Sequence, residues 1–208
     1  MAPLAVAWDV DGTLIDSEPL HHRALVEVCR EWGIDLSGLA ERAFRGIHME
    51  DVWSALRDRM PPGADRQSWL DAINAYYLAN REKLLPMPNA LETVAALASK
   101  GLRQVCVSNS NRSIVDANIR ALKIERFIEF SVSLDDVARG KPDPCPYARC
   151  CERLGLQPSS VIAVEDTRAG IESAHAAGLV VLAYAPTLAD GALAATQIDD
   201  LAQVIDYC

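Results

Sequence analysis

Short apolar runs alternate with helix-like segments along most of this chain, and this alternation limits the possible folds more than any other feature. Each run is bounded by a polar or glycine-containing turn, which is typical of strands buried on both faces of a parallel sheet. The predicted strands cover Leu4–Trp8, Arg103–Val107, Val161–Val164 and Val180–Ala185, with a weaker fifth over Ile128–Ser133. The pattern therefore predicts an α/β fold with a Rossmann-like, doubly wound parallel sheet.

Helices are predicted between these strands, at Leu91–Lys100, Ile114–Leu122, Pro146–Leu154 and Ala169–Ala177. Three of them are followed directly by a glycine, namely Gly101, Gly155 and Gly178. A glycine just past a helix end adopts the left-handed conformation that closes the last turn. The two kinds of signal agree, which supports the helices and their ends together.

The segment 16–86 breaks this rhythm, because it contains no convincing strand and reads as several successive helices. In the first, Ser17 is the predicted N-cap, Pro19 lies in the first turn and Gly33 ends the helix. Its apolar stripe consists of Leu20, Ala24, Val28 and Trp32. The stiff stretch Leu85–Pro88 then leads back to the main fold. We therefore predict a discontinuous core domain, residues 1–15 and 87–208, interrupted by an all-helical cap domain, residues 16–86.

Composition narrows the function classes. Half of the 208 residues are hydrophobic, which is enough for a real core, and the net charge of −9 disfavours nucleic acid or an anionic membrane as partner. No apolar run approaches the roughly 20 residues of a membrane span, and the N-terminus lacks the pattern of a signal peptide. A cytoplasmic location is therefore expected. The six cysteines lack zinc-site spacing and are expected to be reduced thiols, several of them buried.

The strongest chemical signal is Asp9-Val10-Asp11-Gly12-Thr13, directly after the first predicted strand. Ligands of a parallel sheet bind outside the carboxyl ends of its strands, so a site is expected at this loop. Two carboxylates one residue apart suit different tasks, since one can attack or bind metal while the other handles protons. Taken alone, the motif could equally be an acidic turn on a solvated loop.

Polar residues follow two more predicted strands. Ser108-Asn109-Ser110 comes after Arg103–Val107, close to a helix start whose free N–H groups suit phosphate. Glu165-Asp166 closes Val161–Val164, where paired carboxylates could hold a hard cation such as Mg²⁺. Ordinary helix caps are the simpler explanation for each motif alone.

Lys141 lies between two prolines, in Gly140-Lys141-Pro142-Asp143-Pro144. A compact ammonium on a stiff loop is a good phosphate clamp, although a solvated surface lysine is the default interpretation. Each motif alone has an ordinary structural explanation, but four such motifs around the strand ends of one sheet favour a common functional site. The sequence therefore predicts a single site at the carboxyl ends of the strands.

Together the four motifs resemble those of the haloacid dehalogenase-like (HAD) hydrolase superfamily, over essentially the whole chain. The matching elements, in motif order, are Asp9–Thr13, Ser108, Lys141 and Glu165-Asp166. Three further stretches, Asp16–His21, Gly140–Pro144 and Val164–Gly170, are similar to its phosphatase and β-phosphoglucomutase-like branch. The helical insertion resembles the C1-type cap of that branch.

The resemblance implies a phosphatase that acts on a small phosphorylated metabolite through an aspartyl phosphate on Asp9. Asp11 would protonate the leaving oxygen and then activate the hydrolytic water. A Mg²⁺ ion would be held by Asp9, Asp166, the main-chain carbonyl of Asp11 and Glu165. The residues expected to bind phosphate are Gly12, Thr13, Ser108, Asn109 and Lys141.

Other activities of the superfamily remain open. A sugar phosphomutase would need a second phosphate grip, but the mutases carry an arginine where this chain has Met49 and a lysine where it has Asn111. A dehalogenase typically has an aromatic residue at the position of Asp11. A non-catalytic regulatory protein should have lost some of the acidic residues or Lys141. Hydrolysis is favoured.

The cap is expected to select the substrate. Arg45, Gly46 and His48 lie in a predicted cap loop, and His21 either couples cap closure to the chemistry or is only a helix-surface histidine. A cap of this size favours a small sugar phosphate or phospho-acid, and a monomer is expected. Which metabolite is bound is left open by the sequence.

Overall fold

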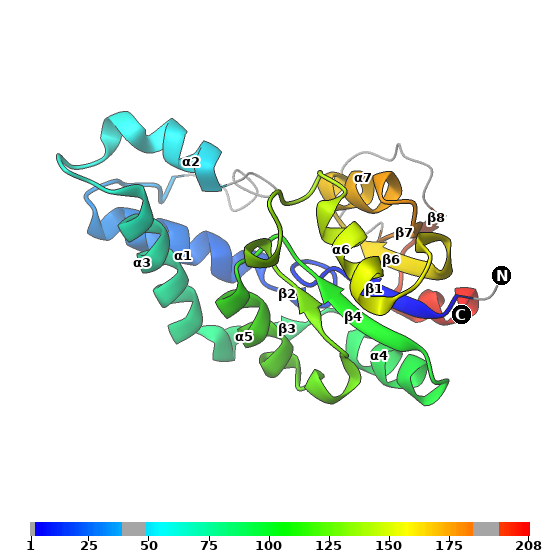
Figure 1. The fold of residues 1–208 in the computed structure, drawn as a ribbon. Helices are drawn as coiled ribbons and strands as arrows, with labels where there is room; N and C mark the ends of the chain where they lie inside the picture. Colours follow the sequence, from blue (N-terminus) through cyan, green and yellow to red (C-terminus); the bar gives the residue numbers. More distant parts are fainter. Residues whose placement is uncertain (1–2, 39–48, 185–195) are drawn as a thin grey trace. The chain divides into compact units, whose positions relative to one another are not determined.

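The structure of the protein is a computed structural model in which residues 3–38, 49–184 and 196–208 are described (Figure 1). The chain divides into two compact units, one formed by Met1–Asp16 and Leu85–Cys208 and the other by Ser17–Leu84. That these units are independent domains stays a prediction.

A six-stranded sheet forms the centre of the larger unit, and all of its strand pairs are parallel. Its order is β5-β4-β1-β6-β7-β8. The strands are β1 (Ala5–Trp8), β4 (Arg103–Val107), β5 (Ser131–Val132), β6 (Val161–Glu165), β7 (Val180–Tyr184) and β8 (Thr196–Ile198). The predicted α/β fold with a parallel sheet is confirmed. Because β1 lies between β4 and β6, the residue after β1 emerges in the middle of the sheet.

Helices cover both faces of this sheet, with α6 and α7 on one side and α4 and α5 on the other (Figure 1). Their bounds are α4 (Ala90–Ser99), α5 (Arg112–Leu122), α6 (Cys145–Leu154) and α7 (Arg168–Ala176). Side chains alternate between the faces as the strand period requires. Ala7 belongs to the core under α6 and α7, whereas the next residue, Trp8, donates through Nε1 to Gln104 Oε1 on the α4 side.

The predicted elements agree with the structure except at their ends and in the weaker strands. The strand Arg103–Val107 has the predicted bounds, and each of the four core helices begins or ends within two residues of its prediction. The fifth strand is shorter than expected, Ser131–Val132. Ile128 closes the 3₁₀ turn Glu125–Phe127, and Glu129 and Phe130 bond to the main chain of β4 without being part of the regular strand. Ala185, the predicted end of another strand, lies outside the described residues.

Two features of the larger unit were not predicted. One is β8, and the other is a short antiparallel pair between β2 (Ile15–Asp16) and β3 (Leu85–Pro86). This pair joins the two points at which the chain leaves and re-enters the larger unit. In the described parts of both units, 3₁₀ helices cover Arg57–Arg59, Arg81–Lys83, Glu125–Phe127, Leu134–Asp136, Pro158–Ser160 and Leu201–Tyr207.

The regular structure of the smaller unit is helical, and no strand occurs among its described residues. It contains α1 (Glu18–Glu31), α2 (Met49–Leu56) and α3 (Arg66–Ala79), and α1 packs against α3. The predicted stripe of α1 is buried at Leu20, Ala24 and Val28, while Trp32 lies just past the helix end and is half-buried. Ser17 occupies the N-cap position but makes no capping hydrogen bond, because its backbone is already helical.

No helix among residues 3–38, 49–184 and 196–208 combines the length and the apolar character that crossing a bilayer requires. All six cysteines belong to the described residues and form no disulfide there, and four of them are buried.

Candidate active site

Three neighbouring strands deliver the predicted site residues to one edge of the sheet. Asp9 directly follows β1, Ser108 directly follows β4, and Glu165 ends β6 with Asp166 next to it. Because these strands are parallel and adjacent, their carboxyl ends coincide. Lys141 reaches the same point from the loop before α6. The structure therefore brings together the residues that four separate motifs contributed.

Lys141 lies at the centre of a buried network. Its Nζ donates to Oδ1 of Asp9 at 2.6 Å, to Oε1 of Glu165 at 2.5 Å and to the carbonyl oxygen of Val107 at 2.8 Å. A buried ammonium is tolerable only with such acceptors. Burial by itself opposes the charge, but the carboxylates of Asp9 and Glu165 outweigh it and raise the pKa of Lys141 above its usual value. Lys141 is therefore a fixed positive charge beside Asp9.

The loop that carries Lys141 is held from the neighbouring strand end by Asn109. The side-chain oxygen of Asn109 accepts from the backbone N–H of Lys141 at 2.7 Å, and its Nδ2 donates to the Lys141 carbonyl oxygen at 3.0 Å. A Cβ on Gly140 would lie 2.5 Å from the Asn109 side chain. Asn109 thus positions the lysine loop, and its expected contact with phosphate stays a prediction.

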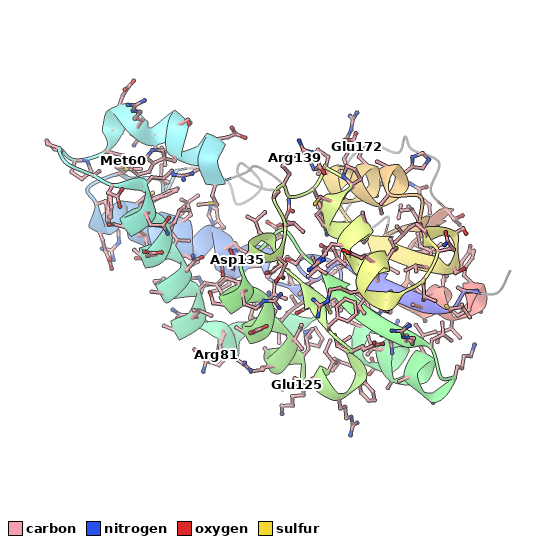
Figure 2. All side chains as sticks on the ribbon, viewed as in Figure 1. Met60, Arg81, Glu125, Asp135, Arg139 and Glu172 are labelled. Carbon is pink, nitrogen blue, oxygen red and sulfur yellow. The ribbon has the colours of Figure 1, made fainter. Side chains whose placement is uncertain are left out.

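Another basic residue of the same loop has the opposite environment. Arg139, two residues before Lys141, is 77% exposed and pairs with Asp143 at 2.7 Å. Its side chain extends away from the sheet (Figure 2). The loop therefore presents one cation to solvent and buries the other in the site.

Glu165 is completely buried and accepts from several donors. Besides Lys141, the hydroxyl of Tyr147 donates to its Oε1 at 2.5 Å, and Thr167 Oγ1 donates to its Oε2 at 3.4 Å. Gly170 in α7 leaves room for this carboxylate, because a Cβ there would lie 1.9 Å from Oε2. Tyr147 was not predicted as a site residue, since an aromatic side chain on the apolar face of a helix is typical of a hydrophobic core.

Asp9, Glu165 and Asp166 form a buried group of carboxylates. Each of them offers an oxygen atom that lies within 4.8 Å of those of the other two. Burial raises the pKa of Asp9 well above its usual value, and Lys141 opposes this shift only in part. Among the described residues, the ammonium of Lys141 pairs with Asp9 and Glu165, and a further positive charge would stabilise the three neighbouring carboxylates as anions.

One oxygen of this group has no partner. Within the part of the chain that the structure describes, Oδ2 of Asp9 is buried and makes no hydrogen bond. An unpaired buried carboxylate oxygen is costly unless a cation or substrate meets it. Oxygen donors alone are the ligand set that suits Mg²⁺. The residues present therefore fit a magnesium ion.

Two further residues shape the loop after Asp9. Thr13 Oγ1 donates to Oδ1 of Asp166 at 3.0 Å. Gly12 has a left-handed φ of +87°, and a Cβ on it would lie 2.4 Å from Oδ2 of Asp166. Its N–H donates to the carbonyl oxygen of Ile15 at 2.9 Å. These residues hold the loop and Asp166 in place, and their predicted phosphate contacts are left as predictions.

The carboxylate of Asp11 is held separately from the acidic group. Its Oδ2 accepts from Ser110 Oγ at 2.9 Å and from Ser108 Oγ at 3.2 Å, while its Oδ1 accepts from Nδ2 of Asn118 at 2.8 Å. Asn118 lies on α5 and was not found by sequence analysis. The two acids of the first motif thus have different surroundings, as different chemical tasks require. The predicted metal contact of Asp11, through its main-chain carbonyl, stays a prediction.

Comparison with known proteins gives the family. The family model described as "haloacid dehalogenase-like hydrolase" matches residues 3–178, which is most of the chain. The chain belongs to the haloacid dehalogenase-like hydrolases.

Individual relatives cover this hydrolase to different extents. It is 30% identical over 180 residues to Hexitol phosphatase B of Escherichia coli (strain K12), covering 84% of this chain and 80% of that one. It is also 30% identical to Protein SUPPRESSOR OF QUENCHING 1, chloroplastic, of Arabidopsis thaliana, over 91% of this chain but only 18% of that much longer protein. The crystal structure of CbbY from Rhodobacter sphaeroides in complex with phosphate superposes with a TM-score of 0.84 at 23% identity, covering 97% of this chain and 96% of that one.

The residues expected to select the substrate of this hydrolase are only partly described. Arg45, Gly46 and His48 lie outside the described residues. His21 belongs to the helical unit, where its ring stacks on Tyr77 of α3 with centroids 4.4 Å apart. This contact contributes to the packing of the helical unit, and a role of His21 in the site stays a prediction.

Proposed function

We propose that this hydrolase is a Mg²⁺-dependent phosphatase that cleaves a small phosphorylated metabolite through an aspartyl phosphate on Asp9. One observation carries the proposal. Asp9 is buried with Oδ1 bonded to Lys141 and Oδ2 unpaired among the described residues, so one oxygen is restrained and the other is available to attack. Phosphatase relatives, including Hexitol phosphatase B, support the reaction class.

In the first step, Oδ2 of Asp9 forms a bond to phosphorus while the bond between phosphorus and the leaving oxygen breaks. The leaving oxygen keeps that electron pair and takes a proton from Asp11. Lys141 and Ser108 stabilise the oxygens of the phosphoryl group as its charge redistributes. The products of this step are the free alcohol and the phosphorylated enzyme.

In the second step, water attacks phosphorus and Asp11 takes the proton that the water loses. The bond between phosphorus and Oδ2 of Asp9 breaks, which returns Asp9 as a carboxylate and releases inorganic phosphate. Because Asp11 gives a proton in one step and accepts one in the other, the enzyme ends the cycle unchanged.

A bound Mg²⁺ would be held by Asp9, Asp166 and the main-chain carbonyl of Asp11, with Glu165 beside them. It would supply positive charge that keeps Asp9 ionised and lets an anionic phosphate approach. Glu165 already accepts from Lys141 and Tyr147 through Oε1, so it also anchors the lysine.

The substrate class that we propose is a sugar phosphate or a phospho-acid, with cytoplasmic location and a monomeric state as further expectations. A β-phosphoglucomutase-type reaction is the alternative. Asn111 weighs against it, since its side chain caps α5 by accepting from Ile114 N at 3.1 Å and from Ser113 Oγ at 2.7 Å. This residue is committed to the helix start and replaces the lysine of the mutases.

The test measures phosphate released from a panel of sugar phosphates and phospho-acids with Mg²⁺ present. Wild-type protein, Asp9→Asn and the control Asp206→Asn, an exposed aspartate of the same unit, are compared, each with and without EDTA. We expect release by the wild type and the control, and loss in Asp9→Asn and under EDTA. Equal activity of Asp9→Asn would contradict the nucleophile assignment. No release from any compound would favour the mutase, to be tested next with glucose 1-phosphate and a trace of bisphosphate.

A further inference from the structure

Asn118 is an unusual residue for its position in the fold. It lies on α5 between Ile114 and Leu122, one helical turn from each, and all three side chains are buried. An apolar residue would fill this stripe without the cost of burying an amide. The amide is tolerated because it is hydrogen-bonded, and its Nδ2 donates to the carboxylate of Asp11.

The two oxygens of Asp11 are held from different elements. Ser108 and Ser110, in the loop after β4, both donate to Oδ2, and the Ser108 hydroxyl also accepts from the backbone N–H of Ser110 at 3.0 Å. Asn118 donates to Oδ1 from a helix. The plane of the carboxylate is therefore fixed from two directions.

The helix that carries Asn118 is itself firmly attached. Its start is capped by Asn111, and Arg112 in its first turn donates to the side-chain and main-chain oxygens of Ser131 and pairs with Asp136. A donor on such a helix can fix the orientation of a side chain more accurately than a donor on a loop.

The chemistry of an amide nitrogen adds a constraint on the proton. Nδ2 of Asn118 can only donate, and the hydroxyl oxygen of a carboxylic acid is a poor acceptor. When Asp11 carries its proton, the proton therefore belongs on Oδ2. The hydroxyls of Ser108 and Ser110 can rotate from donating to accepting, so this oxygen keeps partners in both states.

We propose that Asn118 is the positioning residue for Asp11: it fixes the orientation of the carboxyl group and assigns the transferable proton to Oδ2. The inference rests on the proposed function, in which Asp11 is the general acid. Asn118 itself touches neither the phosphate nor the metal ligands in this account. Its loss should weaken proton delivery while leaving the attack by Asp9 intact.

Two substrates of similar shape separate proton delivery from attack. Phenol is a weaker acid than p-nitrophenol, so phenyl phosphate needs a proton on its leaving oxygen more than p-nitrophenyl phosphate does. The quantity measured is kcat/KM, which covers only the steps up to release of the phenol. The decisive number is the ratio of the two kcat/KM values, with nitrophenyl over phenyl.

We expect this ratio to rise roughly tenfold in Asp11→Asn and at least about threefold in Asn118→Leu, relative to the wild type. The control Leu122→Ala loosens the same buried face of α5 without removing a bond to Asp11, so its ratio should equal that of the wild type. If Asn118→Leu is unfolded by circular dichroism, Asn118→Ser, which is smaller and shortens the donor out of reach, carries the same expectation.

The outcomes distinguish the two levels of the account. If Asp11→Asn leaves the ratio unchanged, the general-acid role in the proposed function is wrong. If Asp11→Asn raises it but the Asn118 variants lower both kcat/KM values by equal factors, or not at all, the positioning role of Asn118 is overturned. A rise in Leu122→Ala as large as in Asn118→Leu would also overturn it, since loosened packing would then suffice.

Discussion

The ammonium of Lys141 lies 2.6 Å from Oδ1 of Asp9, and both side chains are buried. The same ammonium holds Glu165, while Oδ2 of Asp9 has no hydrogen bond to any described residue. One contact thus restrains the proposed nucleophile and leaves its second oxygen unpaired.

Replacing Lys141 by methionine should lower both the catalytic rate and the free energy of unfolding. The buried carboxylates of Asp9 and Glu165 lose their compensating charge, and removing one partner of a buried ion pair typically costs about 3–5 kcal/mol of the free energy of unfolding. Loss of a charge that stabilises the transferred phosphoryl group should lower kcat by roughly 10²–10³-fold. Urea unfolding and phosphate release measure the two effects. The control Lys123→Met, an exposed lysine after α5, should change neither.

The pH dependence of this stability follows from the raised pKa of Lys141. A group whose folded-state pKa is raised stabilises the fold fully below its unfolded pKa, about 10.4 for lysine, and loses this contribution as pH rises through the folded value. The stability difference between wild type and Lys141→Met should therefore be constant from neutral pH to mildly alkaline pH and shrink only at higher pH. A difference that vanished at neutral pH would contradict the ion pair.

Tyr147→Phe should destabilise the protein with little effect on catalysis. The phenol hydroxyl donates to Oε1 of the buried Glu165 and makes no hydrogen bond to Asp9 in the part of the chain that the structure describes. A lost bond to a charged group is worth about 1.5–3 kcal/mol. Thermal unfolding should show this loss, while kcat stays within about threefold of the wild type. Tyr207→Phe, at an exposed position, is the matched control and should be neutral.

Gly170→Ala should disrupt the site from the helix behind it. The new Cβ would lie 1.9 Å from Oε2 of Glu165, so the carboxylate or α7 has to move. Overpacking of this kind costs typically 1–3 kcal/mol or more, and displacement of Glu165 should also lower activity through Lys141. Gly38→Ala offers the contrast, because its Cβ would meet open space. Equal stability of the two variants would show that Glu165 is not confined as described.

Mg²⁺ should stabilise the folded protein, because it binds carboxylates that only the fold brings together. At a free concentration 100 times its Kd, the ion should add about 2.7 kcal/mol to the free energy of unfolding. Asp166→Asn should remove most of this gain, and Asp206→Asn should keep it. Thermal unfolding with Mg²⁺ and with EDTA measures the difference. A gain that survives in Asp166→Asn would place the ion elsewhere.

The parallel sheet and the main site residues could be predicted from the sequence because both depend on local patterns. Apolar runs such as Arg103–Val107 are long enough to be recognised, and a polar residue after each run marks the same edge of the sheet. β8 could not be found, because Thr196–Ile198 has three residues of which only Ile198 is buried. The start of the edge strand β5 was predicted too early, since Ile128 closes a 3₁₀ turn instead of extending the strand.

The supporting residues escaped prediction for a different reason. Asn118 and Tyr147 lie on the buried faces of helices, where a polar atom and its partner more than 15 residues away meet only after folding. The phosphate contact expected of Asn109 stays a prediction, whereas its bonds to the main chain of Lys141 could not be foreseen from the motif. Sequence motifs indicated which residues gather, and the structure adds which of them hold the others.

The formation of a covalent aspartyl phosphate on Asp9 is the central claim, and trapping it is the most direct test. Asp11→Asn should accept a phosphoryl group from p-nitrophenyl phosphate, which needs little acid catalysis, and should then hydrolyse it slowly because the base is missing. After an acid quench, mass spectrometry of the digested protein should find one added phosphoryl group on Asp9, absent in Asp9→Asn. A phosphoryl group on another residue, or nitrophenol released in a burst with no adduct, would contradict the account.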